Sequence, residues 1–360
     1  MSGSLVPPDA RPLTERRPRG TSFAGLVGVE LRRLWWRRLT KGVLLGVLAV
    51  LALATFSIYQ DTSPENLAER ADEYTLMVEQ MRQEQARMTP EQRAEQIASC
   101  KRDEATAAAE GGGGVTDFGC DRMFAIPSPS DYGLTSTSNE AIVRGIVVEG
   151  VSVFGFLAFI LGASFVAAEF ATGSMGTWLT FQPRRLRVAS AKLCAAALGG
   201  LAVGVVAVVL GLLCAAMIST VNRPGVDLPL VETTAPGSVW QELARAVVAI
   251  TLGGLGGAVI GFLLRSTAGV IGAVLGWVVV VEGLVGSTLA GGRLQPWLVR
   301  TNLDAFVNDG TFYTATTCGA GGCQTAPVAL SFTHGWVYLL VVTSAGVAAA
   351  LLLFRRRDVT

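Results

Sequence analysis

Residues that could carry catalytic or metal-binding chemistry are few in this chain of 360 residues. The single histidine, His334, rules out a zinc motif of the H-E-x-x-H type and counts against a Ser/His/Asp triad. No G-x-x-x-x-G-K-S/T loop occurs, so we do not expect the chain itself to hydrolyse nucleotides. His334 lies at the outer end of an apolar run, where an interfacial polar role is favoured over catalysis. We therefore predict no catalytic residue, metal site or cofactor within this chain.

Two carboxylates inside long apolar runs are candidates for function. Glu149 lies about two turns into its run from the outer side, and Glu282 lies near the middle of another, after Val278–Val281. An ionisable group inside a membrane is costly, and by default it marks a functional site. Glu282 could face a cavity or pair with Arg245 or Arg144. The alternative is a protonated, hydrogen-bonded glutamate with a structural role, and the sequence leaves both interpretations open.

The six cysteines fall into three pairs along the chain. Cys100 and Cys120 share one polar segment, Cys318 and Cys323 share another, and Cys194 and Cys214 lie within one apolar run. An even number of cysteines in segments that face an oxidising compartment favours disulfides. We predict the bonds Cys318–Cys323 and Cys100–Cys120. The alternative is free thiols that happen to lie close together.

The apolar runs themselves dictate the fold class. Hydrophobic residues make up 51% of the chain and charged residues only 16%, against about 25% in a typical soluble domain. Crossing the hydrocarbon core takes roughly 20 residues at about 1.5 Å rise each, and six runs reach or approach that length. A soluble core of six such helices would need a far larger polar shell. We therefore predict an all-α, polytopic protein with six transmembrane helices in the bilayer of the cell membrane.

The predicted organisation alternates spans with polar segments. The spans are residues 42–60, 142–168, 193–221, 243–264, 268–290 and 335–354. Around them lie a cytoplasmic tail with an interfacial helix (1–41), an outer helical segment (61–141), a cytoplasmic coupling segment (169–192), two outer loops (222–242 and 291–334) and a cytoplasmic tail (355–360).

The distribution of lysine and arginine predicts the orientation in the membrane. Six spans place both termini on one side, which holds 17 of the 29 Lys and Arg residues but only five of the 28 acids. Cytoplasmic loops carry an excess of Lys and Arg, so both termini are predicted to be cytoplasmic. These basic residues lie close to the predicted spans, so we interpret them as topology signals and not as a nucleic-acid interface. The polar, basic N-terminus predicts an uncleaved first span rather than a signal peptide.

Three local patterns predict how individual helices are built. A helix over residues 23–41 has an apolar face suited to the membrane surface and an opposite polar face. The apolar face holds Phe23, Val27, Leu31, Leu34 and Trp35, and the polar face holds Glu30, Arg33 and Arg37. Residues 64–104 lack glycine and predict two helices that part near Thr89-Pro90, with Thr89 and Gln92 capping the second. Gly253, Gly257 and Gly261 share one face, so a neighbouring helix, within the chain or in a second copy, can approach closely.

The segment between the second and third spans is the most informative part of the sequence. It opens with Glu169 and Phe170, has glycines at 173 and 176 for a sharp turn, continues as a short apolar helix, and stops at Pro183. Basic residues then lead back to the membrane: Arg184, Arg185, Arg187 and Lys192. We predict a small amphipathic structure at the cytoplasmic face that offers Glu169 and the arginines to a soluble partner.

This arrangement resembles the permease subunits of the type-2 ATP-binding-cassette (ABC) transporter family. Their second cytoplasmic segment typically reads Glu, an aromatic residue, any two residues, Gly-Thr, an apolar stretch with Pro, then Arg and Ala-Lys. The matching residues here are Glu169, Phe170, Gly173, Pro183, Arg185 and Ala191-Lys192, with Gly176-Thr177 three residues later than usual if Gly173 is the counterpart. An interfacial N-terminal helix, six spans and the ending Phe354-Arg355-Arg356-Arg357-Asp358-Val359 extend the resemblance over nearly the whole chain.

The resemblance implies a transport subunit, expected to be an exporter, and not an enzyme. A separate ABC-type ATPase would hold ATP and Mg, and a second permease chain would complete a homo- or heterodimer. The segment 169–187 would couple the two kinds of subunit. Two alternatives remain open: a membrane-embedded enzyme, and a non-transporting anchor or sensor that binds through residues 61–141.

Overall fold

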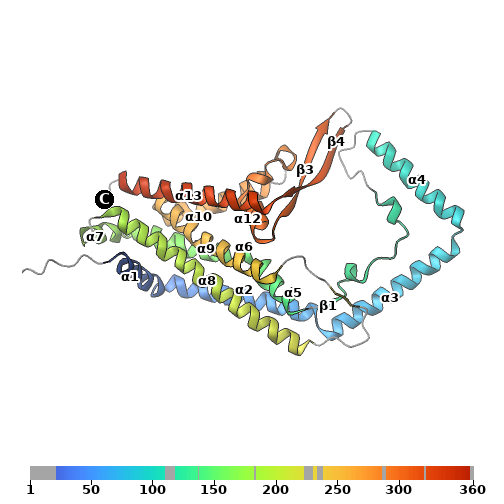
Figure 1. The fold of residues 1–360 in the computed structure, drawn as a ribbon, viewed down its shortest axis with the longest axis horizontal. Helices are drawn as coiled ribbons and strands as arrows, with labels where there is room; N and C mark the ends of the chain where they lie inside the picture. Colours follow the sequence, from blue (N-terminus) through green and yellow to red (C-terminus); the bar gives the residue numbers. More distant parts are fainter. Residues whose placement is uncertain are drawn as a thin grey trace, which may run out of the picture.

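The computed structural model describes residues 22–109, 118–136, 138–181, 184–222, 230–232, 238–285, 289–319 and 322–356 (Figure 1). Within these residues six helices are long and apolar enough to cross a membrane, which confirms the predicted fold class. They are α2 (Arg38–Asp61), α6 (Val151–Ala171), α8 (Arg185–Val221), α9 (Val239–Leu264), the stretch Thr267–Leu284, and α13 (Phe332–Arg356).

The centre of the bundle is the close contact of α9 with α6 and α8. A methyl group at Gly257 would overlap the carbonyl oxygen of Phe159 in α6, and one at Gly253 would overlap the backbone of Gly155. The neighbouring Gly254 lies against the backbone of Ala196 and Gly200 in α8 in the same way. The glycine pattern in α9 therefore serves packing within the chain, because only residues without a side chain let three backbones approach this closely.

The third span is longer than predicted. α8 is one helix of 37 residues, and its first two turns contain Arg185, Arg187 and Lys192. These residues were predicted to precede a span that begins at residue 193. Arginine and lysine are good helix formers, and no glycine or proline separates them from the apolar run, so the helix extends past the membrane without a break. The connector helix α7 (Ser174–Phe181) precedes it.

The fifth span changes from α-helical to π-helical geometry toward its C-terminal end. It starts as the α-helix α10 (Thr267–Gly276) and continues as the π-helical stretch η4 (Trp277–Val285). The candidate span ends at Leu284, whereas the predicted run reached residue 290. Residues 286–288 lie outside the described residues, so the end of this span at residue 290 and the depth of Glu282 within it stay predictions.

Two long helices, α3 (Pro64–Arg87) and α4 (Pro90–Ala109), form a bent arm at the end of the bundle that is predicted to face outward (Figure 1). The hydroxyl of Thr89 accepts a hydrogen bond from the Gln92 amide at 3.3 Å, and Gln92 accepts one from the Thr89 amide at 2.9 Å. This reciprocal cap confirms the predicted break. Short 3-10 turns η1 (Cys120–Arg122) and η2 (Pro129–Tyr132) follow, then α5 (Asn139–Val143) and the π-helical stretch η3 (Arg144–Val148).

A small apolar cluster fixes the base of the arm. Its members are Leu67, Ala71, Tyr74, Tyr132, Leu134 and Leu230. Cys100 in α4 and Cys120 in η1 lie at bonding distance with their Cα atoms 5.7 Å apart, a geometry that fits the predicted disulfide. The strand β1 (Thr135–Ser136) pairs in parallel with β2 (Val231–Glu232).

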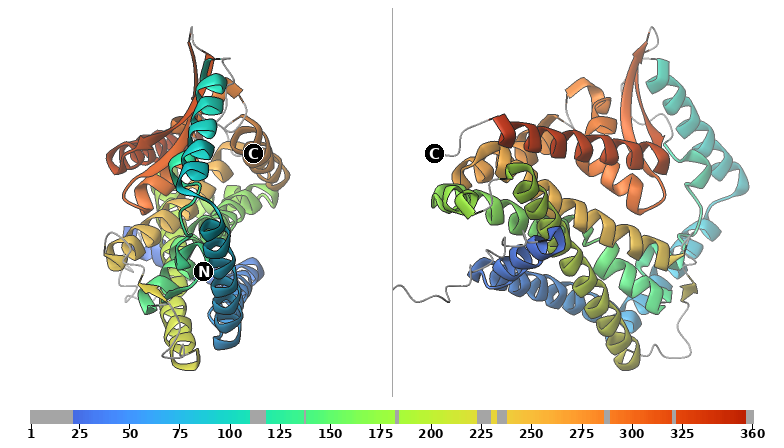
Figure 2. Two further views of the ribbon diagram at one scale, coloured as in Figure 1. Left: turned by 90° about the vertical axis from the view of Figure 1, so that its right-hand side faces the viewer. Right: turned by 60° about the vertical axis from the view of Figure 1, so that its left-hand side comes forward.

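The last outer segment contains a β-hairpin that was not predicted. Short turns η5 (Leu289–Gly292) and η6 (Gln295–Trp297) and the helix α12 (Val299–Val307) lead into β3 (Thr311–Gly319), which pairs with β4 (Gly322–Leu330). The far end of α4 lies beside this hairpin in each view (Figure 2). The register pairs Cys318 with Cys323, and the second disulfide stays a prediction.

Candidate functional site

The N-terminal helix α1 (Phe23–Trp35) lies along α8 and buries part of the face that was predicted to be polar. Glu30, predicted on that polar face, is buried together with Leu26 and Leu34. Trp35, predicted on the face suited to the membrane surface, is exposed. The physical reason for the burial of Glu30 is a group of complementary charges on α6 and α8 that the polar face of α1 meets.

Lys192 is the centre of that group. Its side chain is fully buried, and its Nζ lies 2.7 Å from Glu30 Oε2 and 2.7 Å from Glu169 Oε2. Lys192 comes from α8, Glu30 from α1 and Glu169 from the C-terminal end of α6. One ammonium group therefore joins three helices, and each charge that has left water has a partner of opposite sign.

Two arginines complete what we call the connector cluster, defined as Glu30, Arg33, Arg37, Glu169 and Lys192. Arg37 places Nη2 2.9 Å from Glu169 Oε1 and donates from Nη1 to the Ser164 carbonyl at 3.2 Å. Arg33 Nη1 lies 3.6 Å from Glu30 Oε1 and 3.7 Å from Glu169 Oε1. Three cations thus surround two carboxylates.

Aromatic faces cover the surplus positive charge. The guanidinium of Arg37 and the Nζ of Lys192 lie 5.0 and 4.7 Å from the ring centre of Phe165 in α6. The guanidinium of Arg33 lies 5.1 Å from the ring centre of Trp178 in α7. Cations are attracted to aromatic faces, so the contact with Trp178 links the connector helix to the cluster.

Glu169 is consequently not offered to a soluble partner, which corrects the sequence-based expectation. Only 2% of its surface is exposed, because both oxygens face cations inside the protein. Lys192 is equally inaccessible. Both residues hold the connector in place, and exposed side chains must make any contact with another subunit.

Phe170, next in sequence, anchors the connector on the other side of the bundle. Its ring packs edge-on against Phe262 of α9 and Phe354 of α13, at centroid distances of 5.9 and 6.2 Å. Phe262 and Phe354 themselves lie 5.3 Å apart, and the Arg265 guanidinium lies 5.0 Å from the Phe170 ring. We call this set the aromatic cluster. Two adjacent residues thus fix the start of the connector to α1, α8, α9 and α13.

The connector itself turns at Gly173, whose φ of 68° is in the left-handed region that favours glycine. On α7 itself Met175 is buried, while Thr177 and Thr180 are exposed. Arg184 is exposed and Arg185 and Arg187 are half-buried. Gly176 lies within α7, and the predicted stop at Pro183 lies outside the described residues.

The two carboxylates that were predicted to lie inside spans differ sharply in their surroundings. Glu149 was predicted about two turns into the second span, but the candidate span begins two residues after it, at Val151. Glu282 Oε1 accepts hydrogen bonds from the Trp277 indole at 3.0 Å and from the Val299 and Arg300 amides at 3.1 and 3.4 Å. It therefore caps the N-terminus of α12 and ties it to the fifth span. Glu149 is exposed, and among the residues that the structure describes none bonds to its carboxylate.

Neither suggested partner of Glu282 pairs with it. Arg144 Nη1 lies 2.9 Å from Glu242 Oε1, and Arg245 Nη1 lies 3.0 Å from Asp309 Oδ1. Backbone amides stabilise the Glu282 carboxylate instead. The structural interpretation of Glu282 as a hydrogen-bonded group is therefore the better supported one.

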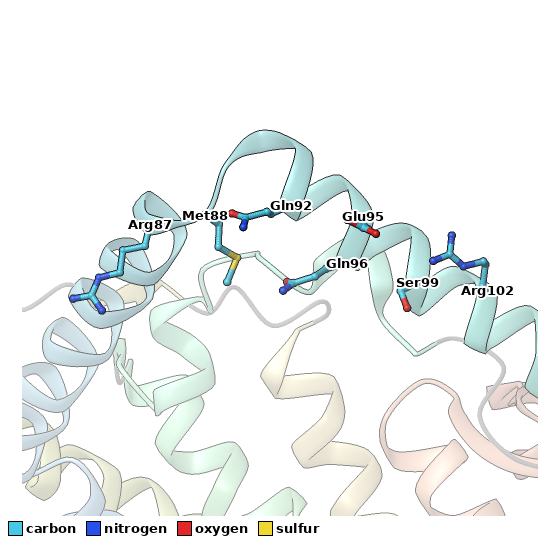
Figure 3. A pocket seen from close by; sticks show the side chains of 7 residues that line it. All are labelled: Arg87, Met88, Gln92, Glu95, Gln96, Ser99 and Arg102. Carbon is cyan, nitrogen blue, oxygen red and sulfur yellow. The ribbon is translucent and has the colours of Figure 1, made fainter.

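No compact catalytic constellation is found in the described part of the chain. It contains no group of three or more His, Cys, Asp and Glu residues that could hold a metal ion. His334 is exposed, with its ring edge-on to Trp297. An open hollow beside α4 is lined by surface side chains of the arm, among them Arg87, Gln92 and Arg102 (Figure 3). It involves none of the predicted site residues.

Several residues of the site were not singled out from the sequence. They are Phe165, Trp178, Phe262 and Phe354. Glu30, Arg33 and Arg37 were placed on a helix face but not assigned to the connector. The available signal was charge: Glu30 and Glu169 are two of only five acids on the side predicted to be cytoplasmic, which holds 17 Lys and Arg residues.

Comparison with known proteins agrees with this architecture. No curated protein and no solved structure matches the chain. The family described as ABC-2 family transporter protein matches residues 33–359, which include all six candidate spans, the connector and most of the connector cluster. Membership implies a membrane subunit of an ABC transporter that associates with an ABC ATPase. The chain belongs to the ABC-2 family of transporter proteins.

Proposed function

We propose that this chain is the permease of an ATP-driven exporter and that α7 receives the movement of a separate ATPase. In this proposal ATP and Mg are bound by the ATPase, and two permease chains, identical or different, form the membrane part. The chain resides in the cell membrane with both termini in the cytoplasm. Neither an embedded enzyme nor a pure sensor accounts for a connector so firmly tied to the spans.

The observation that carries the proposal is the double anchoring of the connector. A force on α7 acts on Arg33 through Trp178, and so on α1 and the N-terminal end of α8 through Glu30, Glu169 and Lys192. The same force reaches α9 and α13 through Phe170. Buried charged pairs and close-packed rings resist deformation, so a displacement of α7 moves helices rather than only a loop.

Exposed residues at the connector are the proposed contact surface for the ATPase. They are Thr177 and Thr180 on α7 and Arg184 at the start of α8. A guanidinium at this position fits a carboxylate on the partner through paired hydrogen bonds. Its position directly before α8 would transmit a pull along that helix.

Co-purification tests the proposal. An affinity-tagged chain is extracted from its native membranes, and bound ABC ATPase is identified by mass spectrometry. We expect Arg184→Glu and Thr177→Arg to reduce the retained ATPase at least about fivefold, because charge reversal of one interfacial pair costs a kcal/mol or more. Arg300→Glu is the matched control, since it reverses an equally exposed arginine on the outer side. Undiminished retention with both connector variants would refute the docking surface.

A further inference from the structure

We propose that the outer half of one face of α6 binds a lipophilic organic cation, with the Glu149 carboxylate as its counter-charge. The proposed site, here called the outer α6 face, consists of Ser152, Val153 and Phe156 of α6 together with Glu149, which precedes the helix by two residues. All four side chains are exposed, and Val153 and Phe156 leave 46% and 42% of their surface free. Binding of the cation needs no ATPase, whereas its identity as a transported substrate rests on the proposed function.

Contacts between α2 and α6 give the depth of this face. Gly145 lies against the side chain of Ile58, near the outer end of the first span, and Leu157 lies against Gly46 near its inner part. Glu149 is four residues inward from Gly145, which corresponds to about 6 Å along a helix. Glu149 also precedes the candidate span that begins at Val151 by two residues, so its carboxylate lies at the predicted outer boundary of the membrane, where a nearby cation would stabilise it.

The chain does not supply that partner within its described residues. Arg144, one turn outward on the same helix, is bound to Glu242 at 2.9 Å. Arg245 in α9 is bound to Asp309 at 3.0 Å and lies over the Phe332 ring. The Glu149 carboxylate is thus left for a cation from outside the chain.

The same helix face is covered farther inward. Phe159, Ala163 and Ala167 continue it at helical spacing, and they pack against Val270 and Val274 of α10. Outward from Phe159 this cover ends, and the residues of the outer α6 face become exposed. The open part is therefore bounded by α10 at its inner end and carries its only charge at the outer end.

The side chains present define the chemistry of the ligand. A carboxylate attracts a positive charge, Val153 offers apolar surface, and a Phe ring attracts cations over its face. Glu149 and Phe156 lie two helical turns apart, about 10 Å along the axis. These distances fit a bulky cation whose charge is shielded by apolar groups, because such an ion loses little hydration on entering the membrane. An anion of the same shape is repelled.

Equilibrium binding to the purified full-length chain in lipid nanodiscs tests this inference. The probes are tetraphenylphosphonium and tetraphenylborate, which have the same shape and opposite charge. We expect the wild-type chain to bind the phosphonium and not the borate. Glu149→Gln, which keeps the size but removes the charge, should weaken phosphonium binding about tenfold. Glu140→Gln removes an exposed carboxylate two to three turns outward on the same helical segment and should change nothing.

Three outcomes would overturn the inference. The first is equal binding of both probes. The second is phosphonium binding that Glu149→Gln leaves intact. The third is a disulfide between two chains that both carry Val153→Cys, formed where no probe binds. The last outcome would show that a second copy covers the outer α6 face. Because no ATPase takes part, these results are independent of the co-purification test of the proposed function.

Discussion

The buried side chain of Lys192 holds together charged groups from three helices. Its ammonium group lies 2.7 Å from two carboxylates that come from different helices. Lys192→Met keeps the length of the side chain but leaves Glu30 and Glu169 facing each other without the central cation. We expect a loss of about 3–5 kcal/mol in the free energy of unfolding, typical of breaking a buried pair from one side. Denaturant unfolding in detergent measures it.

Two further variants make the Lys192 prediction specific. Lys41→Met removes an exposed lysine and should leave stability within about 0.5 kcal/mol of the wild type. The double variant Lys192→Met with Glu30→Gln should recover part of the loss, because one unpaired charge disappears. If Lys192→Met alone were as stable as the wild type, Lys192 would contribute no net stability.

Asp304 in α12 predicts a pH effect on the outer side. Burial raises its pKa above the ordinary value of 3.8, Arg300 opposes the rise, and Glu282 adds to it. Because its pKa is higher in the folded chain, the protonated Asp304 carboxyl favours the folded state. This stabilisation is complete at a pH below the pKa of the unfolded chain, and it is lost as pH rises through the raised pKa of the folded chain. We expect Asp304→Asn to raise the melting temperature at pH 7 to 8 and to have little effect near pH 4. Asp103→Asn, an exposed change in α4, is the control. A benefit independent of pH would contradict the prediction.

At the scale of elements, the contact between α6 and α9 depends on glycine. A methyl group at Gly257 would overlap the Phe159 carbonyl oxygen, whereas one at the adjacent Gly256 would meet only a ring atom of Phe159 at 4.0 Å. We expect Gly257→Ala to destabilise the chain by about 1–3 kcal/mol, as overpacking does, and Gly256→Ala to be neutral or slightly stabilising through better helix propensity. Thermal unfolding of the two variants side by side checks this. Equal melting temperatures would show that the helices separate without cost.

Elements could be predicted from the sequence where one local signal decides them. Span length decided the six membrane helices, and Thr89, Pro90 and Gln92 decided the break in the outer arm. The hairpin after α12 was missed because its strands carry no clear apolar alternation, and two strands stabilise each other only once they are paired. The burial of Glu30 in α1 was missed for a related reason: its partner Lys192 and the neighbouring Glu169 are remote in sequence, and a local apolar pattern does not reveal them.

The same limit applies to the candidate site. The Glu169–Lys192 segment was identified from residue types and order, but whether each side chain points outward or inward depends on other helices. Glu169 and Phe170 are neighbours in sequence, yet one contacts charges of α1 and α8 and the other contacts rings of α9 and α13. Such contacts between distant segments carry no periodic signal within a single sequence.

At the scale of the whole molecule, the charges predict which side faces the cytoplasm. Helices α1 and α7 and the C-terminal end of α13 lie at one end of the bundle, and the arm of α3 and α4 lies at the other (Figure 1). The first of these ends carries the basic residues Arg33, Arg37, Arg184 and Arg355. A membrane retains basic segments on the cytoplasmic side, so α7 should be inside and α4 outside. Cysteine accessibility in intact cells separates this orientation from its reverse.

The experiment uses exposed positions at the two ends, Thr180→Cys in α7 and Ala98→Cys in α4. Both are placed in a chain whose cysteines at 194, 214, 318 and 323 are serine, while Cys100 and Cys120 stay paired. A membrane-impermeant maleimide should label Ala98→Cys in intact cells and Thr180→Cys only after permeabilisation, because a charged reagent cannot cross the hydrocarbon core. Labelling of Thr180→Cys in intact cells would place the connector outside. No ATPase could then reach it, and the coupling role proposed for α7 would fail together with the orientation.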